Sequence, residues 1–332
     1  AYEICACLVG SERCIRDRIT GTSLGGFPAA YAETQAEYMA SGKATEQEKL
    51  VAGCPEYAFN EYLQIGLEQG LVGLALFIGW LGLLFYKGIK NKRYACCGGL
   101  MSLAIFAFSS YPLQLPEFWV VLIFLGVMSV TPDKDEIREN QAESNGHRWG
   151  KQIFFMGIAI LGIGLFWMQK DHYKAYQQWN KAQMFYNNKA YEAALEVYEP
   201  LYPLLKHKPE FLFEAAQSLS KTGQYEKANE YLERAVLLSS DPMLYYVMAK
   251  NEQCLGEYRQ AEKHLLHAID ILPERIYPYY LLMNLYTEPS YFQPAKLKMA
   301  IDSVLTKKPK VESSAIKEMK EKARSMLNNT SI

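Results

Sequence analysis

The feature that most constrains the fold of this chain is a repeat in its C-terminal half. Aromatic residues head four similar segments at Tyr191, Tyr225, Tyr258 and Phe292, which begin 34, 33 and 34 residues apart. Each segment then has an alanine and, four residues later, a large side chain: Ala194, Ala228, Ala261 and Ala295, then Tyr198, Leu232, Leu265 and Met299. A fixed period of this length is typical of helix pairs that stack into a solenoid, because one pair alone cannot bury its apolar face.

The code of one aromatic, one small and one large residue resembles the tetratricopeptide repeat. The resemblance implies an α-solenoid over residues 171–310, in which the small alanine lets two helices approach and the aromatic fills the gap to the next pair. Pro289 and Pro294 interrupt the fourth segment. The stretch SSAIKEMKEKARSML predicts a capping helix, followed by a tail, within residues 311–332. Such a solenoid has no catalytic chemistry of its own, and we expect its concave face to bind a protein partner.

The middle of the chain predicts membrane helices. Four apolar segments span Gly70–Gly88, Tyr94–Tyr111, Pro116–Thr131 and Gln152–Gln169. Each is close to the roughly 20 residues that cross a bilayer core, and four such runs argue against the alternative of a buried soluble core. The predicted fold class is therefore all-α, with polytopic membrane helices over residues 70–170 followed by a soluble tetratricopeptide-repeat α-solenoid.

Basic residues set the predicted orientation. The first connection, KGIKNKR, carries four Lys and Arg residues and no acid, whereas the second, YPLQLPE, carries neither Lys nor Arg. Because Lys and Arg favour the cytoplasmic side, we expect the first and third connections inside and the second outside. Residues 19–69 and the repeats then share the outer side. This predicts a multi-pass protein of the bacterial inner membrane, with its repeat domain in the periplasm.

Net charge and cysteine spacing limit the classes of function that the chain can have. The net charge of −1 gives no basic excess for nucleic acid. The seven cysteines form no C-x-x-C pair and no zinc spacing, so neither a metal nor a cofactor is predicted. Residues 1–18 match no pattern downstream and are interpreted as a leader or scar. The start at Ala1 is interpreted as the C-terminal part of a longer membrane protein.

Two short helices are predicted in the extracytoplasmic loop, residues 19–69. An LGGF turn precedes AYAETQAEYMASG, and TEQEKLVAG follows. In the second of these segments Thr45 can cap the helix, with Glu48 three residues on to complete a capping box.

A polar stripe lies at the end of this loop, in PEYAFNEYLQIGLEQGLVGL. At the helical angle per residue, its members fall on one face about 100° wide: Tyr57, Asn60, Glu61, Gln64 and Glu68. The stripe can be simply the solvated side of an interfacial helix. Glu68, however, stands at the lipid boundary, where an ionisable group is costly and tends to be functional.

The same stretch resembles the O-antigen ligase and polymerase superfamily, of the type found in Bacteroidetes. The pattern N-x-x-L-Q-x-x-x-E-x-G-x-x-G is carried by Asn60, Leu63, Gln64, Glu68, Gly70 and Gly73. Many members place His before this Asn, whereas this chain has Phe59, so the resemblance does not extend to a histidine-dependent step. It covers roughly residues 20–170.

The resemblance implies an enzyme that transfers a glycan from a polyprenyl-diphosphate donor in the membrane lipid to an acceptor outside. The polar stripe and the loop supply the candidates for this chemistry. The candidate catalytic residues are Glu61, Glu68 and Asn60, and the candidate substrate-binding residues are Tyr57, Gln64, Lys43 and Lys49. A carboxylate can accept the acceptor's proton, and a cation can stabilise the leaving diphosphate. The alternative is a membrane-anchored repeat scaffold without catalysis. A transporter is disfavoured, because no ionisable group lies deep in the predicted spans.

Overall fold

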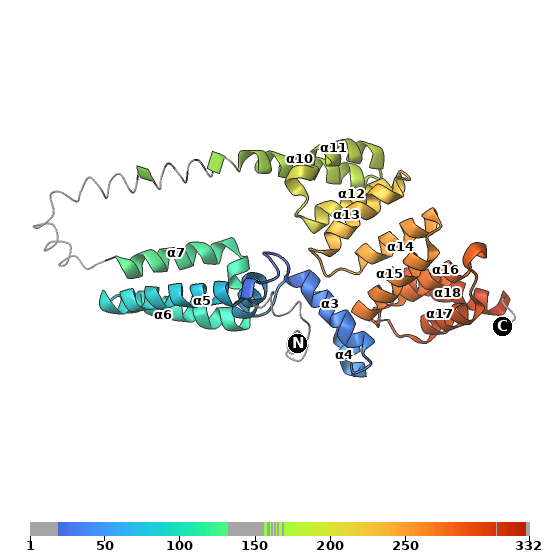
Figure 1. Cartoon of the computed structure of the whole chain (residues 1–332), viewed down its shortest axis with the longest axis horizontal. Coiled ribbons are helices and arrows are strands. Elements are labelled where there is room, and N and C mark those ends of the chain that lie inside the picture. The colour runs from blue at the N-terminus through green and yellow to red at the C-terminus, as the bar shows by residue number, and fades with distance from the viewer. Residues whose placement is uncertain are drawn as a thin grey trace, which may run out of the picture. The chain divides into compact units, whose positions relative to one another are not determined.

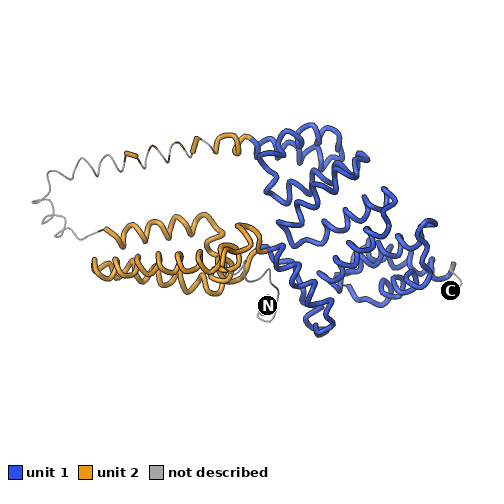
Figure 2. The backbone as a smooth tube through the Cα atoms, viewed as in Figure 1, with its two compact units in different colours: residues 1–10, 28–56, 175–332 blue, residues 11–27, 57–174 orange. Residues whose placement is uncertain are grey.

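The computed structural model describes residues 19–131, 156–157, 160, 162, 164, 166–167, 169–309 and 311–329. The described chain is helical and divides into two compact units (Figures 1 and 2). Unit 1 contains residues 28–56 and 175–329, and unit 2 contains residues 19–27 and 57–174. Unit 1 therefore joins part of the predicted loop to the repeats.

The repeats form four consecutive helix pairs and a final helix. The helices are α10 (Lys170–Asn187), α11 (Tyr191–Leu205), α12 (Pro209–Lys221), α13 (Tyr225–Val236), α14 (Met243–Leu255), α15 (Tyr258–Ile271), α16 (Ile276–Tyr286), α17 (Pro294–Thr306) and α18 (Ser314–Asn329). From α11 onward each helix packs against the next, and α12, α14, α16 and α18 also contact one another in succession. This is a tetratricopeptide-like solenoid, as the sequence predicts, and α18 packs on its last helix pair.

The repeat code describes the core of the first three pairs. Ala194, Ala228 and Ala261 are completely buried, each at 0% exposure. The large residues that follow them, Tyr198, Leu232 and Leu265, are also buried. The small side chain at the crossing lets the helices approach closely, and the large one fills the adjoining space.

The predicted register of the fourth pair is wrong. Ala295 is exposed and Met299 is 70% exposed, so neither lies in the core. Leu297, Ile301 and Val304 are buried instead, with the same spacing of four and three residues as the core positions of the earlier pairs. The core of the fourth pair thus lies two positions later than the period predicts.

Extra residues between α16 and α17 account for this shift. The connection contains the 3₁₀ helix η2 (Pro289–Tyr291), and α17 begins directly at Pro294. Proline suits the first turn of a helix, where its missing N–H has no helical partner anyway. Tyr291 stacks on Tyr258 of the preceding pair, with ring centroids 5.6 Å apart. The prolines therefore lengthen the connection and leave the helix pair intact.

In the first three pairs, the turn between the two helices contains a left-handed residue. Gly223 and Gly256 fill this position with φ of +82° and +79°. The equivalent residue of the first pair is Lys189, with φ of +62°. A side chain makes the left-handed region unfavourable, so Lys189 is a point of local strain.

Residues 28–56 pack on the repeats within unit 1. The predicted helices are present as α3 (Phe27–Ala40) and α4 (Glu46–Val51), and Thr45 and Glu48 form the predicted capping box. Ala32 and Ala36 of α3 share a buried apolar cluster with Ile271 and Leu272 at the end of α15.

Unit 2 contains α5 (Glu61–Lys90), α6 (Tyr94–Ser109), the 3₁₀ helix η1 (Pro112–Gln114) and α7 (Pro116–Val130). Leu84, Leu100, Leu113 and Leu122 form its small core. Many apolar side chains on the outer faces are exposed, such as Leu76 at 69%.

Among the described residues, α5 with 30 residues is the one helix that is long and apolar enough to cross a membrane. The helices α6 and α7 are apolar but shorter, with 16 and 15 residues. The fourth predicted segment, Gln152–Gln169, lies largely outside the described residues. The four-helix membrane domain therefore stays a prediction.

Candidate functional site

Asn60 starts the polar end of α5. Its side-chain oxygen accepts a hydrogen bond of 3.0 Å from the backbone N–H of Leu63, so Asn60 is the N-cap and the helix begins at Glu61. Tyr57 therefore lies before the helix, and of the stripe only Glu61, Gln64 and Glu68 lie within it. Tyr57 instead stacks on Tyr111, with ring centroids 5.6 Å apart.

Glu61 joins α5 to the connection between α6 and α7. Its carboxylate accepts 2.7 Å from the backbone N–H of Leu113 and 3.4 Å from the side chain of Gln114. With 1% exposure, the Glu61 side chain is sealed from solvent. A carboxylate fixed by two donors in this way positions a neighbouring loop and has fewer lone pairs left to bind a substrate.

Gln64 and Glu68 form a buried pair one turn further along α5. The Gln64 side chain accepts 3.0 Å from the backbone N–H of Ala58 and donates 3.2 Å to the Glu68 carboxylate. Both side chains are nearly buried, at 3% and 8% exposure. Among the described residues, no other side chain donates to Glu68, which leaves this carboxylate the most available acceptor in the stripe.

The helix breaks immediately after this pair. Gly70 has φ of +70° and ψ of −176°, which are not helical values. The carbonyls of Leu67 and Glu68, freed by the break, accept from the backbone N–H groups of Thr22 and Ser23 at 2.8 and 3.1 Å. Residues 22 and 23 thus supply the hydrogen bonds that the helix loses at its break.

Two glycines make this crossing possible. A Cβ on Gly70 would lie 2.2 Å from the Ile19 carbonyl oxygen, and a Cβ on Gly21 would lie 2.1 Å from the Glu68 carbonyl oxygen. Both φ angles are positive, +70° and +79°. The crossing therefore requires glycine on each side. The sequence motif contains Gly70, but no sequence signal pairs it with Gly21.

The predicted site residues are divided between the two units. Asn60, Glu61, Gln64 and Glu68 gather at the start of α5 in unit 2, with Tyr57 at their edge. Lys43 and Lys49, the predicted cations, belong to unit 1.

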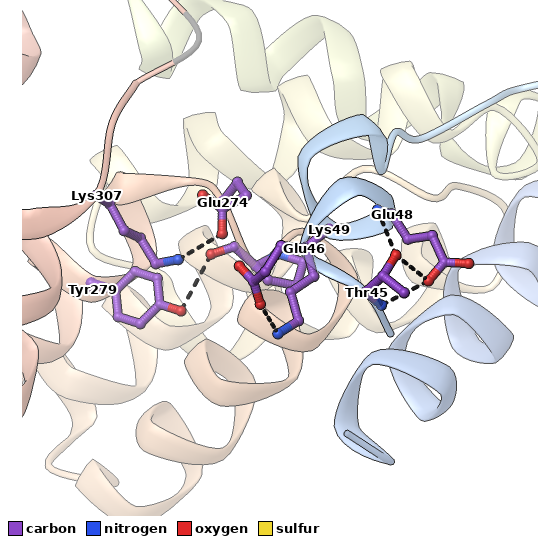
Figure 3. A network of polar contacts seen from close by, with 8 residues as sticks. Thr45, Glu46, Glu48, Lys49, Glu274, Tyr279 and Lys307 are labelled. Carbon is purple, nitrogen blue, oxygen red and sulfur yellow. Dashed lines mark hydrogen bonds and ion pairs between the residues drawn. The ribbon is translucent and has the colours of Figure 1, made fainter. Parts of the chain in front are cut away.

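Lys49 takes part in polar contacts at the surface of unit 1. It pairs with Glu46 at 2.8 Å within α4, and Glu274 pairs with Lys307 at 2.9 Å between the repeat helices (Figure 3). Lys43 is exposed in the turn after α3. No group of three or more His, Cys, Asp or Glu side chains in the described part of the chain could hold a metal ion.

A second candidate site is the first-helix surface, formed by the first helix of each pair together with α18. Its members are Trp179, Gln183, Tyr186, Glu214, Gln217, Lys250, Tyr277, Tyr280, Asn284 and Lys322. The Glu214 carboxylate accepts from Trp179 at 2.7 Å and Gln183 at 2.9 Å, which ties α10 to α12. Further along, Lys322 of α18 donates 2.9 Å to Asn284. No sequence pattern identifies these residues, because the repeat code describes only the core.

Comparisons with known proteins agree with the repeat architecture. A family model described as "Anaphase-promoting complex, cyclosome, subunit 3" matches residues 187–268. With the solenoid above, the match makes residues 187–268 tetratricopeptide-like repeats. No curated protein matches the chain.

Among solved structures, the crystal structure of MamA protein is 17% identical, with a TM-score of 0.38 over 46% of this chain and 88% of that one. A putative kinesin light chain from Podospora anserina, described as having nearly identical TPR-like repeats, is 17% identical, with a TM-score of 0.37 over 47% and 88%. The Yersinia enterocolitica secretion chaperone SycD, in complex with a peptide of the translocator YopD, is 16% identical, with a TM-score of 0.29 over 46% and 92%. None of these likenesses carries an argument about function.

Proposed function

We propose that the chain is a protein-binding scaffold whose repeat unit works beside a membrane. The observation that supports this proposal is the first-helix surface, which presents aromatic, amide and charged side chains from successive helices. Half-buried aromatic residues with nearby polar groups are the side chains that dominate protein recognition. Solenoid surfaces of this kind are extended and suited to a bound polypeptide.

Photo-crosslinking in cells tests the scaffold. A photoreactive phenylalanine analogue replaces Gln217 or Lys250 on the first-helix surface, and Glu233 on the outer side of α13 is the matched control. We expect a discrete covalent adduct from the first two positions and none from the control. Equal adducts from all three positions, or none from Gln217 and Lys250, would contradict the proposal.

A second function is favoured by the buried pair of Gln64 and Glu68 beside the break in α5. Here we propose glycan transfer from a polyprenyl-diphosphate donor to an acceptor at the periplasmic side of a bacterial inner membrane. The acceptor oxygen attacks the anomeric carbon, the bond to the diphosphate breaks, and the Glu68 carboxylate takes the acceptor's proton. Gln64 holds that carboxylate, whereas Glu61 and Asn60 hold the surrounding backbone.

Glu68→Gln tests the second function and separates it from the first. When the variant replaces the native gene, we expect the cells to accumulate lipid-linked glycan and to lose transfer, while the adduct at Lys250 stays unchanged. Glu117→Gln, at the start of α7, is the matched carboxylate control. Full transfer by Glu68→Gln would overturn the catalytic proposal and leave the scaffold proposal standing.

A further inference from the structure

A cavity of about 370 Å³ lies in unit 1, where three separate parts of the chain meet. Ala52 and Lys49 line it from the segment around α4, Ile276 from the start of α16, and Ile316 and Met319 from α18. Its volume falls within the range of about 300–1,000 Å³ that is typical of small-molecule sites. The cavity is mostly apolar, and it exists only while residues 28–56 are docked on the repeats.

Among the described residues, three charged ones line this cavity, and two of them pair with opposite charges. Lys49 pairs with Glu46 at 2.8 Å, and Glu274 pairs with Lys307 at 2.9 Å (Figure 3). The third is Arg275, whose side chain is exposed and makes no ion pair with a described residue. The lining therefore carries one uncompensated positive charge.

A second cation lies against one wall of the cavity. Tyr277 lines it, and the ammonium group of Lys250 lies 5.2 Å from the centroid of that ring. Lys250 also donates to the Tyr277 hydroxyl at 2.5 Å. Lys250 itself does not line the cavity, so the anion contact rests on Arg275. A guanidinium group that is not already paired is well suited to bind a carboxylate through two parallel hydrogen bonds.

We propose that the cavity binds a small anionic amphiphile, a compact apolar chain that carries one acidic group. The apolar chain lies against Ile276, Ile316 and Met319, and the acidic group pairs with Arg275. Burial of the chain provides the affinity, and the Arg275 contact selects an acid over a neutral analogue. This site shares Tyr277 with the first-helix surface, but it takes a small acid and not the proposed protein partner, and it does not use the pair of Gln64 and Glu68.

Photoaffinity labelling of the full chain in lipid nanodiscs tests the proposal. The probe is decanoic acid that carries a diazirine, and the matching primary amide is the neutral control. Labelling is measured by mass spectrometry on peptides of α18 that contain Ile316 or Met319. We expect the acid to label these peptides about tenfold more than the amide, because a charge-assisted hydrogen bond contributes roughly that factor.

Substitutions then locate the anion contact. We expect Arg275→Gln to reduce acid labelling to the level of the amide, and Arg259→Gln, an exposed arginine of α15, to leave it unchanged. Excess octanoate should compete with the probe, whereas a hexapeptide with a free C-terminal leucine should not. Equal labelling by acid and amide, full labelling of Arg275→Gln, or competition by the peptide alone would overturn the proposal. Circular dichroism verifies that each variant is folded.

Discussion

The side-chain amide of Gln35 donates a hydrogen bond of 2.7 Å to the backbone carbonyl of Ile271, across 236 residues of sequence. The same NH₂ group donates 3.1 Å to the carbonyl of Gly53, and Gln35 is completely buried. One side chain therefore closes the segment 28–56 on itself and joins it to the end of α15. Cys54 packs against the same cluster.

Removal of this amide should release the segment. Gln35→Leu removes the donor to the buried carbonyl of Ile271 and to the carbonyl of Gly53, which we expect to lower the free energy of unfolding of unit 1 by about 1–3 kcal/mol. Cys54 provides the local readout. Burial, with a smaller contribution from Asp241, raises the pKa of its thiol to about 11, so alkylation at pH 8 should be slow.

In Gln35→Leu the Cys54 pKa should fall toward its ordinary value of 9.0. The thiolate fraction, and with it the alkylation rate, should then rise by up to about 100-fold. Peptide mass spectrometry measures that rate. Gln177→Leu, at an exposed position of α10, should leave it unchanged. If Cys54 reacts at the same rate in both variants, Gln35 does not hold the segment in place.

Gly21 and Gly70 should tolerate no side chain. Gly70→Ala and Gly21→Ala each place a Cβ about 2 Å from a backbone carbonyl oxygen, which no rotamer change can relieve. The left-handed conformation alone costs roughly 1–2 kcal/mol with a side chain. We expect both variants to lose thermal stability and protease resistance in detergent.

The same helix contains its own controls for this prediction. A Cβ on Gly79 or Gly82 would meet no atom within 4 Å, and both residues are helical. Gly79→Ala and Gly82→Ala should therefore be neutral or stabilising by up to about 1 kcal/mol. Similar losses at all four glycines would indicate general sensitivity of the helix and would refute a specific backbone crossing.

Lys189→Gly should stabilise the repeat unit. Glycine adopts the positive φ of this turn without steric cost, although it also increases the entropy of the unfolded chain, so we expect a net gain of about 0.5–1 kcal/mol. Chemical denaturation of the full chain measures the gain. Gly256→Ala is the reciprocal variant and should destabilise the equivalent turn. A loss of stability in Lys189→Gly would show that the lysine side chain has a role that outweighs the strain.

The repeats should lose stability in acid. Burial by itself would raise the pKa of Glu262, but hydrogen bonds from Lys296, Tyr291 and Tyr286 outweigh it and lower the pKa below its ordinary value of 4.5. A lowered folded-state pKa contributes stability above the unfolded pKa, and this contribution is lost as the pH falls through the folded value.

We therefore expect the melting temperature of unit 1 to decrease as the pH falls below 4.5. Glu262→Gln should lower the melting temperature at pH 7 and flatten this dependence, whereas Glu233→Gln, at an exposed position, should change neither. Thermal unfolding monitored by circular dichroism between pH 3 and pH 7 provides the measurement. An unchanged pH profile in Glu262→Gln would assign the acid sensitivity to another group.

Local patterns in the sequence predicted much of the fold. The alanine positions of three helix pairs and the capping box at Thr45 depend on short-range spacing, and both are present. The fourth pair was misplaced because a turn can gain two residues without changing the helices on either side of it. Core spacing in α17 follows Leu297 and Ile301, which a fixed period cannot locate.

Long-range contacts were not predictable in the same way. Gln35 lies in a segment that looks like a polar surface helix, and no local pattern identifies Ile271 as its partner. In the candidate site, the stripe predicts residues that the structure places together at the start of α5, but their contacts depend on neighbours far along the chain. The Glu61 carboxylate accepts a hydrogen bond from the backbone of Leu113, 52 residues away, whereas the Glu68 carboxylate accepts one from Gln64 of the same helix.

The docking of residues 28–56 on the repeats also has a mechanical consequence. The chain leaves unit 1 at residue 28 toward Gly21 and at residue 56 toward Gly70, and these two glycines cross at the break in α5. Part of any tension applied to the solenoid would therefore pass along these two covalent segments to the crossing beside Glu68, while the third covalent link between the units, at residues 174 and 175, carries the rest.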